Sequence, residues 1–158
     1  MPYTYEYPMP SLTADVVAIS YRTLPGAKRP VPHVLLIRRA YDPFGGCWAL
    51  PGGFVGGNET VEDGAARELK EETGVIRPHL SPNALVGIFS APGRDPRGWV
   101  VTAAYAVIVD EDEVVLAGDD AARACWVPVR HLAGIDYAFD HRQIIEAGLR
   151  HFGLAFPG

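Results

Sequence analysis

Short apolar runs separated by turn residues alternate along the chain with two stretches of helical spacing. Six such runs predict β-strands, at 13–22, 34–39, 48–50, 85–90, 100–109 and 124–127. Residues 24–32 are rich in Pro, Gly and Lys/Arg and predict an exposed turn, so the first two strands should form a hairpin. Residues 114–116 are expected to extend the strand at 100–109 or to pair with it.

The first helix is predicted over residues 61–73. Its apolar stripe recurs at every fourth position, in Val61, Ala65, Leu69 and Thr73. Thr60, with Asp63 three positions later, forms an N-terminal capping pattern, and Gly74 supplies a stop. Gly64 lies inside this helix, where glycine is unfavourable, so we interpret it as a site of close packing.

A second helix is predicted over residues 139–152. It has apolar residues at helical spacing, Ile144, Ile145, Leu149 and Phe152, and Asp140 is its expected cap. Strands around one helix with another helix at the end of the chain predict an α/β fold, an α/β/α sandwich. The Tyr- and Pro-rich residues 1–12 are expected to form an extended arm, and 13–158 a single domain.

Composition limits the kind of protein that this chain forms. It has 158 residues, 48% of them hydrophobic and 21% charged, with a net charge of -5, as in a globular protein without a basic stripe for nucleic acid. We expect a cytoplasmic protein, because neither a signal-peptide pattern nor a membrane-spanning run is seen. Cys47 and Cys125 are interpreted as buried or half-buried thiols, and a reactive nucleophile is the less favoured alternative.

Three glutamates crowd one face of the predicted helix over 61–73. At about 100° per residue, Glu68, Glu71 and Glu72 share this face. Like charges at this spacing repel, so the cluster favours a compensating cation, and carboxylate oxygens suit Mg²⁺ or Mn²⁺. The alternative, on the cluster alone, is an ordinary solvated helix face.

The spacing around these glutamates favours the metal site. Gly53 is followed by Glu59, by Arg67-Glu68-Leu69, by Glu71-Glu72 and by Gly74-Val75, a series that resembles the signature of the Nudix hydrolases. This resemblance implies a Nudix-type α/β/α sandwich with a mixed β-sheet. It also implies an enzyme that uses a divalent metal to cleave nucleoside diphosphates linked to another moiety.

The resemblance assigns roles by position. Glu68 and Glu72 would be the principal metal ligands, with Glu71 as a third and the carbonyl of Gly53 as a further one. The implied cofactor is Mg²⁺, with Mn²⁺ as a possible substitute.

The resemblance also implies a buried ion pair of Glu59 with Arg67, which would orient the helix and its carboxylates. The general base varies within the family. Glu71 is the candidate inside the motif, and Asp119 or Asp120 are candidates on a later loop, although these two are more simply explained as a solvated turn.

Residues 90–109 and 138–145 resemble a branch of the family that contains ADP-ribose pyrophosphatases and regulators with a DNA-binding module. Within these segments, Arg94 and Arg97 are candidates to bind phosphates, with solvated loop residues as the alternative. Trp99 or Phe139 could stack an adenine ring. His141 is a weaker candidate for a substrate contact, since a histidine at a helix N-terminus more often faces solvent.

Three functions remain open from the sequence. The first is hydrolysis of ADP-ribose to AMP and ribose 5-phosphate. The second is hydrolysis of nucleoside triphosphates or dinucleoside polyphosphates, and the third is a noncatalytic nucleotide-sensing module, against which the intact glutamate set argues. The expected partner is a small-molecule nucleotide, without stable nucleic acid or membrane binding, and the N-terminal arm could cross to a second copy in a homodimer.

Overall fold

The protein is described by a computed structural model that covers residues 3–77, 79–118 and 121–158. One mixed sheet has the strand order β3-β2-β1-β6-β5, with β4 also paired to β1 and β7 to β2. The strands are β1 Ser11–Arg22, β2 Val31–Arg39, β3 Trp48–Ala49, β4 Gly52–Phe54, β5 Leu85–Phe89, β6 Val100–Ile108 and β7 Ala121–Pro128. β1 runs parallel to β6 and antiparallel to β2, which confirms the predicted mixed sheet and the first hairpin.

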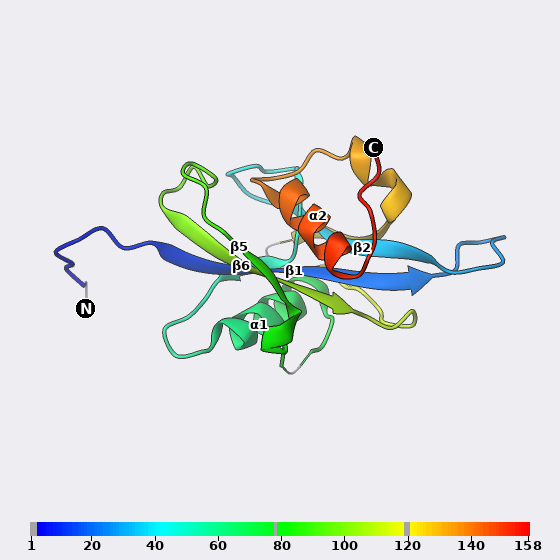
Figure 1. The fold of residues 1–158 in the computed structure, drawn as a ribbon, viewed down its shortest axis with the longest axis horizontal. Helices are drawn as coiled ribbons and strands as arrows, with labels where there is room; N and C mark the ends of the chain where they lie inside the picture. Colours follow the sequence, from blue (N-terminus) through cyan, green and yellow to red (C-terminus); the bar gives the residue numbers. More distant parts are fainter. Residues whose placement is uncertain (1–2, 78, 119–120) are drawn as a thin grey trace.

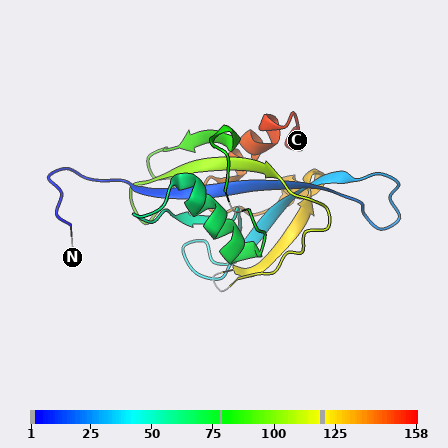
Figure 2. The same cartoon turned by 90° about the horizontal axis from the view of Figure 1, so that it is seen from below.

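Two α-helices cover opposite faces of this sheet. α1, Val61–Thr73, lies below it in Figure 1, and α2, His141–His151, lies above it. Figure 2 shows α1 crossing in front of the central strands. Two short 3₁₀ helices, Pro82–Ala84 and Val129–Gly134, complete the helical elements of the described residues. The predicted α/β/α sandwich is therefore confirmed.

β1 is buried on both sides because it is the centre of the sandwich. One face carries Ala14, Val16 and Ala18 and packs in a cluster with Leu69 of α1. The other face carries Val17 and Ile19, whose cluster includes several residues of α2. A strand covered on both faces has a nearly continuous apolar run instead of an alternating one, which is the pattern seen at Val16–Ile19.

Helix α1 forms as its local sequence predicts. The Thr60 hydroxyl accepts a hydrogen bond from the backbone N–H of Asp63 at 3.1 Å, and Gly74 adopts φ +77° and donates to the carbonyl of Lys70. Gly64 is closely packed, because a Cβ there would lie 3.1 Å from Oε1 of Glu59. The predicted caps and the interpretation of Gly64 are both confirmed.

Some predicted boundaries are wrong. β1 begins at Ser11, which pairs with Val100, so the last two residues of the arm expected over 1–12 belong to the sheet. Residues 114–116 form no strand. The backbone N–H of Leu116 donates to the carbonyl of Thr73 instead, so this segment satisfies a carbonyl that the end of α1 leaves open.

The second helix starts at His141 and not at 139, because Phe139 adopts φ +51°, which is left-handed and cannot continue into a helix. Asp140 occupies the N-cap position, but its side chain makes no capping hydrogen bond. Its carboxylate binds Arg94 instead, so the predicted capping role is wrong.

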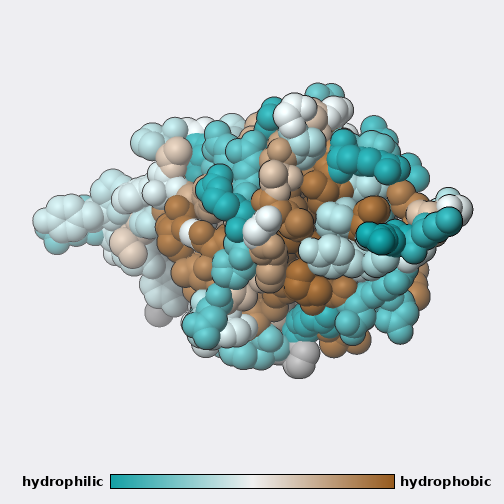
Figure 3. Space-filling model, turned by 45° about the vertical axis from the view of Figure 1, so that its right-hand side comes forward, coloured by the Kyte–Doolittle hydropathy of each residue, from teal (hydrophilic) through white to brown (hydrophobic). Residues whose placement is uncertain are grey.

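Exposed aromatic side chains lie on the N-terminal arm, and the homodimer in which this arm would cross to a second copy stays a prediction. Tyr3, Tyr5 and Tyr7 are exposed on the projecting N-terminal arm, and Figure 3 shows hydrophobic residues at the surface among hydrophilic ones. Cys47 and Cys125 are both partly buried, as predicted, and burial raises the pKa of the Cys125 thiol. Within the described ranges, no helix is both long and apolar enough to cross a membrane.

Candidate active site

A cleft with two connected halves lies beside the N-terminal part of α2 and the middle of the sheet. Both halves are lined by Ile37, Arg39, Gly52, Gly53, Phe54 and Arg97. One half, which we call the acidic end, adds Arg67, Glu68 and Glu72 of α1. The other, which we call the closed end, adds Asp15, Arg94, Phe139 and His141, among others. The cleft therefore joins the predicted metal ligands to several of the predicted substrate contacts.

At the acidic end, two carboxylates of α1 lie against the glycines of β4. A Cβ at Gly53 would be 2.5 Å from the carboxyl carbon of Glu68, so only glycine leaves room for this side chain. Oε2 of Glu72 accepts a hydrogen bond from the backbone N–H of Gly52 at 2.9 Å. The structure thus brings Gly53, Glu68 and Glu72 together, as the spacing of the motif predicts.

Burial makes both carboxylates unfavourable as free anions. It raises the pKa of Glu72 to about 8. The hydrogen bond from Gly52 acts in the opposite direction and lowers this pKa, whereas repulsion from Glu68 and Asp15 raises it further. Burial also raises the pKa of Glu68, against the effect of Arg67. A divalent cation would relieve this cost, and the available donors are hard oxygens. Across the described residues no three acidic, His or Cys side chains form a group that could hold a metal ion, and the two carboxylates that line the acidic end are Glu68 and Glu72.

Arg67 holds the acidic residues in place. Its Nε and Nη2 donate to the two carboxylate oxygens of Glu59 at 3.0 and 2.8 Å, and Nη1 donates to Glu68 at 2.7 Å. The hydrogen bonds from Arg67 lower the pKa of Glu59 to about 2, helped by the N–H of Gly56. The expected pair of Glu59 and Arg67 is present, but it is partly exposed and not buried, since the Arg67 side chain also reaches the surface.

The general base is not identified by the geometry. The side chain of Glu71 is 57% exposed, accepts a hydrogen bond from Nη1 of Arg67 at 3.1 Å and is not among the residues that line the acidic end. Its roles as metal ligand and as base stay predictions. The alternative bases, Asp119 and Asp120, lie outside the described residues.

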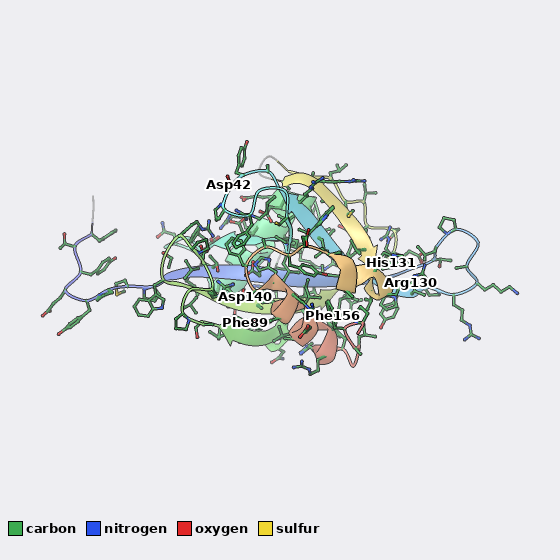
Figure 4. The ribbon with its side chains drawn as sticks, turned by 90° about the horizontal axis from the view of Figure 1, so that it is seen from above. Asp42, Phe89, Arg130, His131, Asp140 and Phe156 are labelled. Carbon is green, nitrogen blue, oxygen red and sulfur yellow. The ribbon has the colours of Figure 1, made fainter. Side chains whose placement is uncertain are left out.

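The two loop arginines already have carboxylate partners. Arg94, whose side chain is 4% exposed, donates from Nε and Nη2 to both oxygens of Asp140, at 2.9 and 2.6 Å. Figure 4 shows Asp140 at the start of α2. Arg97 binds Asp95 and lies over the rings of Phe54 and Phe139, 5.0 and 5.4 Å from their centroids. Arg97 is therefore in a position to meet a ligand, whereas Arg94 holds the β5–β6 loop against α2.

Of the two aromatic residues predicted to stack an adenine ring, one lines the cleft and the other does not. Phe139 lines the closed end, with its ring between Phe44 and His141. Trp99 is 56% exposed and is not among the residues that line the cleft, while its carbonyl accepts a hydrogen bond from Ser11. The structure therefore brings only Phe139 to the site.

The sequence did not indicate several residues that line the cleft, and the charged or aromatic side chains of three of them bear on its chemistry. Arg39 ends the apolar strand β2, Phe54 follows Gly53 in the motif, and Asp15 interrupts an apolar run on β1. A single charge inside a run that is otherwise buried is the signal that could have indicated Asp15. His141 is also buried, against the expectation that it would face solvent, because α2 starts directly over β1.

The sequence matches the NUDIX domain family model over residues 16–148, and the chain belongs to this family. It is 46% identical over 117 residues to an ADP-ribose pyrophosphatase of Methanocaldococcus jannaschii, an alignment that covers 74% of this chain and 66% of the relative. It is 32% identical to the ADPR responsive transcriptional repressor NtrR of Acinetobacter baylyi, over 89% of this chain and 54% of the relative. The chain thus spans between half and two thirds of these relatives.

Solved structures agree with this assignment. The NUDIX domain of Shewanella oneidensis NrtR, solved as a complex with ADP ribose, superimposes with a TM-score of 0.79 at 29% identity and covers 92% of this chain and 90% of that one. A MutT/nudix family protein from Enterococcus faecalis superimposes with a TM-score of 0.77 at 37% identity, over 94% of this chain and 64% of that one. The fold of this chain is therefore that of the Nudix family.

Proposed function

We propose that the protein hydrolyses the diphosphate linkage of ADP-ribose, giving AMP and ribose 5-phosphate, with Mg²⁺ as its cofactor. The observation that carries this proposal is the continuous cleft. It joins two partly buried carboxylates, Glu68 and Glu72, to a pocket with arginine and aromatic side chains. The name of the relative from M. jannaschii supports ADP-ribose as the substrate.

Glu68, Glu72 and the carbonyl of Gly53 are the groups that would hold the metal. When bound, a divalent cation neutralises phosphoryl oxygens and activates water as a nucleophile. Arg67 keeps Glu68 in position through its 2.7 Å hydrogen bond, and the Gly52 N–H does the same for Glu72. In the reaction, the water oxygen forms a bond to phosphorus as the P–O–P linkage breaks, and Glu71 is our candidate to accept the water proton.

Arg39 is placed to bind the diphosphate itself. Its Nε donates to the carbonyl of Pro43 at 2.8 Å, which fixes the guanidinium 5.0 Å from the centre of the Phe139 ring. Within the described part of the chain, its terminal nitrogens have no hydrogen-bonded acceptor, whereas Arg67, Arg94 and Arg97 each bind a carboxylate. Burial lowers the pKa of Arg39, so an anion in the cleft would offset the cost of this partly desolvated charge.

A second candidate, hydrolysis of nucleoside triphosphates, has support from other relatives. The chain is 34% identical over 114 residues to a putative 8-oxo-dGTP diphosphatase 3 of Mycobacterium tuberculosis, which covers 69% of this chain and 51% of the relative. The sensing alternative is less favoured, because loss of a metal-binding glutamate would be its simplest mark and Glu68 and Glu72 are both in place. The cytoplasmic location stays a prediction.

A panel of substrates tests the proposal. The protein is incubated with Mg²⁺ and ADP-ribose, NADH, diadenosine polyphosphates or nucleoside triphosphates, and the released phosphates are identified. We expect AMP and ribose 5-phosphate from ADP-ribose. Glu72→Gln should lower turnover at least 100-fold, on the order of what loss of a key electrostatic group costs, with an unchanged circular dichroism spectrum. Rapid hydrolysis of triphosphates with inert ADP-ribose would contradict the proposal.

A further inference from the structure

Asp15 is a buried carboxylate that lines the closed end but not the acidic end. Among the described residues, it makes no ion pair with the arginines of the cleft. It is 5% exposed and lies on the face of β1 that is covered by α2. The Thr102 hydroxyl donates to Oδ2 of Asp15 at 2.6 Å. No hydrogen bond from the described residues reaches Oδ1. Among the described residues, Oδ1 is not one of the fully buried polar atoms without a partner, so it is open to the closed end and can accept a hydrogen bond from a ligand.

His141 places a donor beside this acceptor. The backbone N–H of Leu50 donates to Nδ1 of His141 at 2.9 Å, so the neutral ring carries its proton on Nε2. Burial lowers the pKa of His141, which favours the neutral ring. Nε2 is 3.7 Å from Oδ1 of Asp15, too far for a hydrogen bond between them. The closed end therefore presents one acceptor and one donor side by side, and neither is satisfied by the other.

The neighbouring side chains define what could reach this pair. The ring of Phe139 has its centroid 5.3 Å from that of His141, and both residues line the same half of the cleft. Gly52 has no side chain, and a Cβ there would collide with Oδ1 of Asp15. Because Asp15, Phe139 and His141 all line the closed end, a group that enters this half of the cleft can reach both Oδ1 of Asp15 and Nε2 of His141.

We propose that Asp15 and His141 recognise the edge of an adenine base, with Oδ1 accepting from the exocyclic amine and Nε2–H donating to a neighbouring ring nitrogen. Adenine carries this donor and this acceptor next to each other. Hypoxanthine has an oxygen in place of the amine, which would face the carboxylate oxygen without a hydrogen. This inference rests on the proposed nucleoside diphosphate substrate and adds the residues that select its base.

Binding of nucleoside monophosphates tests the inference without any hydrolysis. The dissociation constants of AMP, IMP and purine riboside 5′-monophosphate are measured by calorimetry for the wild-type protein. We expect AMP to bind roughly 10- to 100-fold more tightly than the other two, the range for one good pair of base contacts. Equal affinity for AMP and IMP would overturn the inference, whether or not any variant folds.

Asp15→Asn separates recognition from support of the fold. It is isosteric and can still bond to Thr102, but it replaces an obligate acceptor by an amide that can also donate. The ratio of AMP to IMP affinity should fall to about one, whereas the exposed control Asp136→Asn should keep the wild-type ratio. A loss of affinity for both nucleotides by the same factor would indicate a structural role and overturn the inference. Failure of the wild type to hydrolyse ADP-ribose would refute the proposed function alone, because the preference for AMP does not depend on it.

Discussion

Glu72 in its charged form destabilises the folded state when no cation is bound, and for the same reason it favours binding of a cation. Its carboxylate is mostly buried, it receives one backbone hydrogen bond, and it lies near the like charges of Glu68 and Asp15. In a metal-free protein the proton is therefore held more tightly when the chain is folded than when it is unfolded. The same electrostatics that penalise the free anion favour a bound cation.

Glu72 should make the stability of the metal-free protein depend on pH. Its folded pKa, about 8, is above the ordinary value of 4.5, so the folded state holds an extra proton between these values. The free energy of unfolding should then fall as pH rises from about 4.5 to 8, by at most about 1.4 kcal/mol per pH unit from this group. Urea titrations in chelator at several pH values measure it. Glu72→Gln should remove this part of the slope, and an identical slope in both proteins would contradict the assignment.

Arg39 gives a second prediction at this scale. Arg39→Gln removes the guanidinium that we place on the diphosphate, so kcat/KM for ADP-ribose should fall by roughly 10- to 100-fold, as for loss of a hydrogen bond to a charged group. Arg38→Gln is the matched control, because Arg38 is the neighbouring residue on β2 and is not among the residues that line the cleft. Steady-state kinetics of both variants measure the effect. Equal losses in the two would remove Arg39 from the site.

At the scale of elements, a buried ion pair connects two segments far apart in the chain. Arg94 lies in the loop between β5 and β6, and Asp140 directly precedes α2. Two parallel hydrogen bonds hold the loop against the helix, and the same loop carries Arg97 to the cleft. The pair therefore positions one side of the site through the packing of these two elements.

A double-mutant cycle measures this connection. Arg94→Met should destabilise the protein by about 3 kcal/mol, because it leaves the buried Asp140 carboxylate unpaired. The coupling energy between Arg94→Met and Asp140→Asn should exceed about 1 kcal/mol. The pair of Arg142 with Glu146 on α2 is the control, since it is more exposed and its coupling should be below about 0.5 kcal/mol. Similar coupling in both pairs would show that the connection is weak.

At the scale of the whole molecule, the sandwich brings together groups from distant parts of the sequence. β1, β2, β4, the β5–β6 loop and both helices each contribute residues to the cleft. α1, which lies below the sheet in Figure 1, contributes Glu68 and Glu72 to the acidic end, and α2, which lies above the sheet, contributes His141 to the closed end. Binding of a cation at this junction is thereby linked to folding of the entire domain.

Mg²⁺ should therefore stabilise the folded protein. At a concentration 100 times its dissociation constant, a ligand that binds only the folded state adds about 2.7 kcal/mol to the free energy of unfolding. Thermal melts with MgCl₂, compared with NaCl of equal ionic strength, should show a higher Tm. The rise should be lost in the double variant Glu68→Gln/Glu72→Gln. An equal rise in that variant would place the cation elsewhere.

Local patterns account for the predictions that the structure confirms. The span 61–73, the Thr60 cap and the Gly74 stop depend on residues within a few positions of one another, as does the closeness of Glu68 to Glu72. The mixed character of the sheet was implied by the family resemblance, because strand periodicity does not tell parallel from antiparallel pairing. The segment 114–116 was predicted wrongly because its apolar residues suit a strand, whereas the open carbonyls at the end of α1 decide its course.

By itself, the sequence determined which elements form and that two glutamates share a face beside a glycine turn, because helical and strand periods act between near neighbours. Only the tertiary structure decided which charges are free to meet a ligand. Arg94 and Asp140 are 46 positions apart, and Asp15 and Thr102 are 87 apart, yet each pair is joined by a hydrogen bond. Which donor pairs with which acceptor depends on the groups that the fold brings close together, and this cannot be read from residues that are neighbours in the sequence.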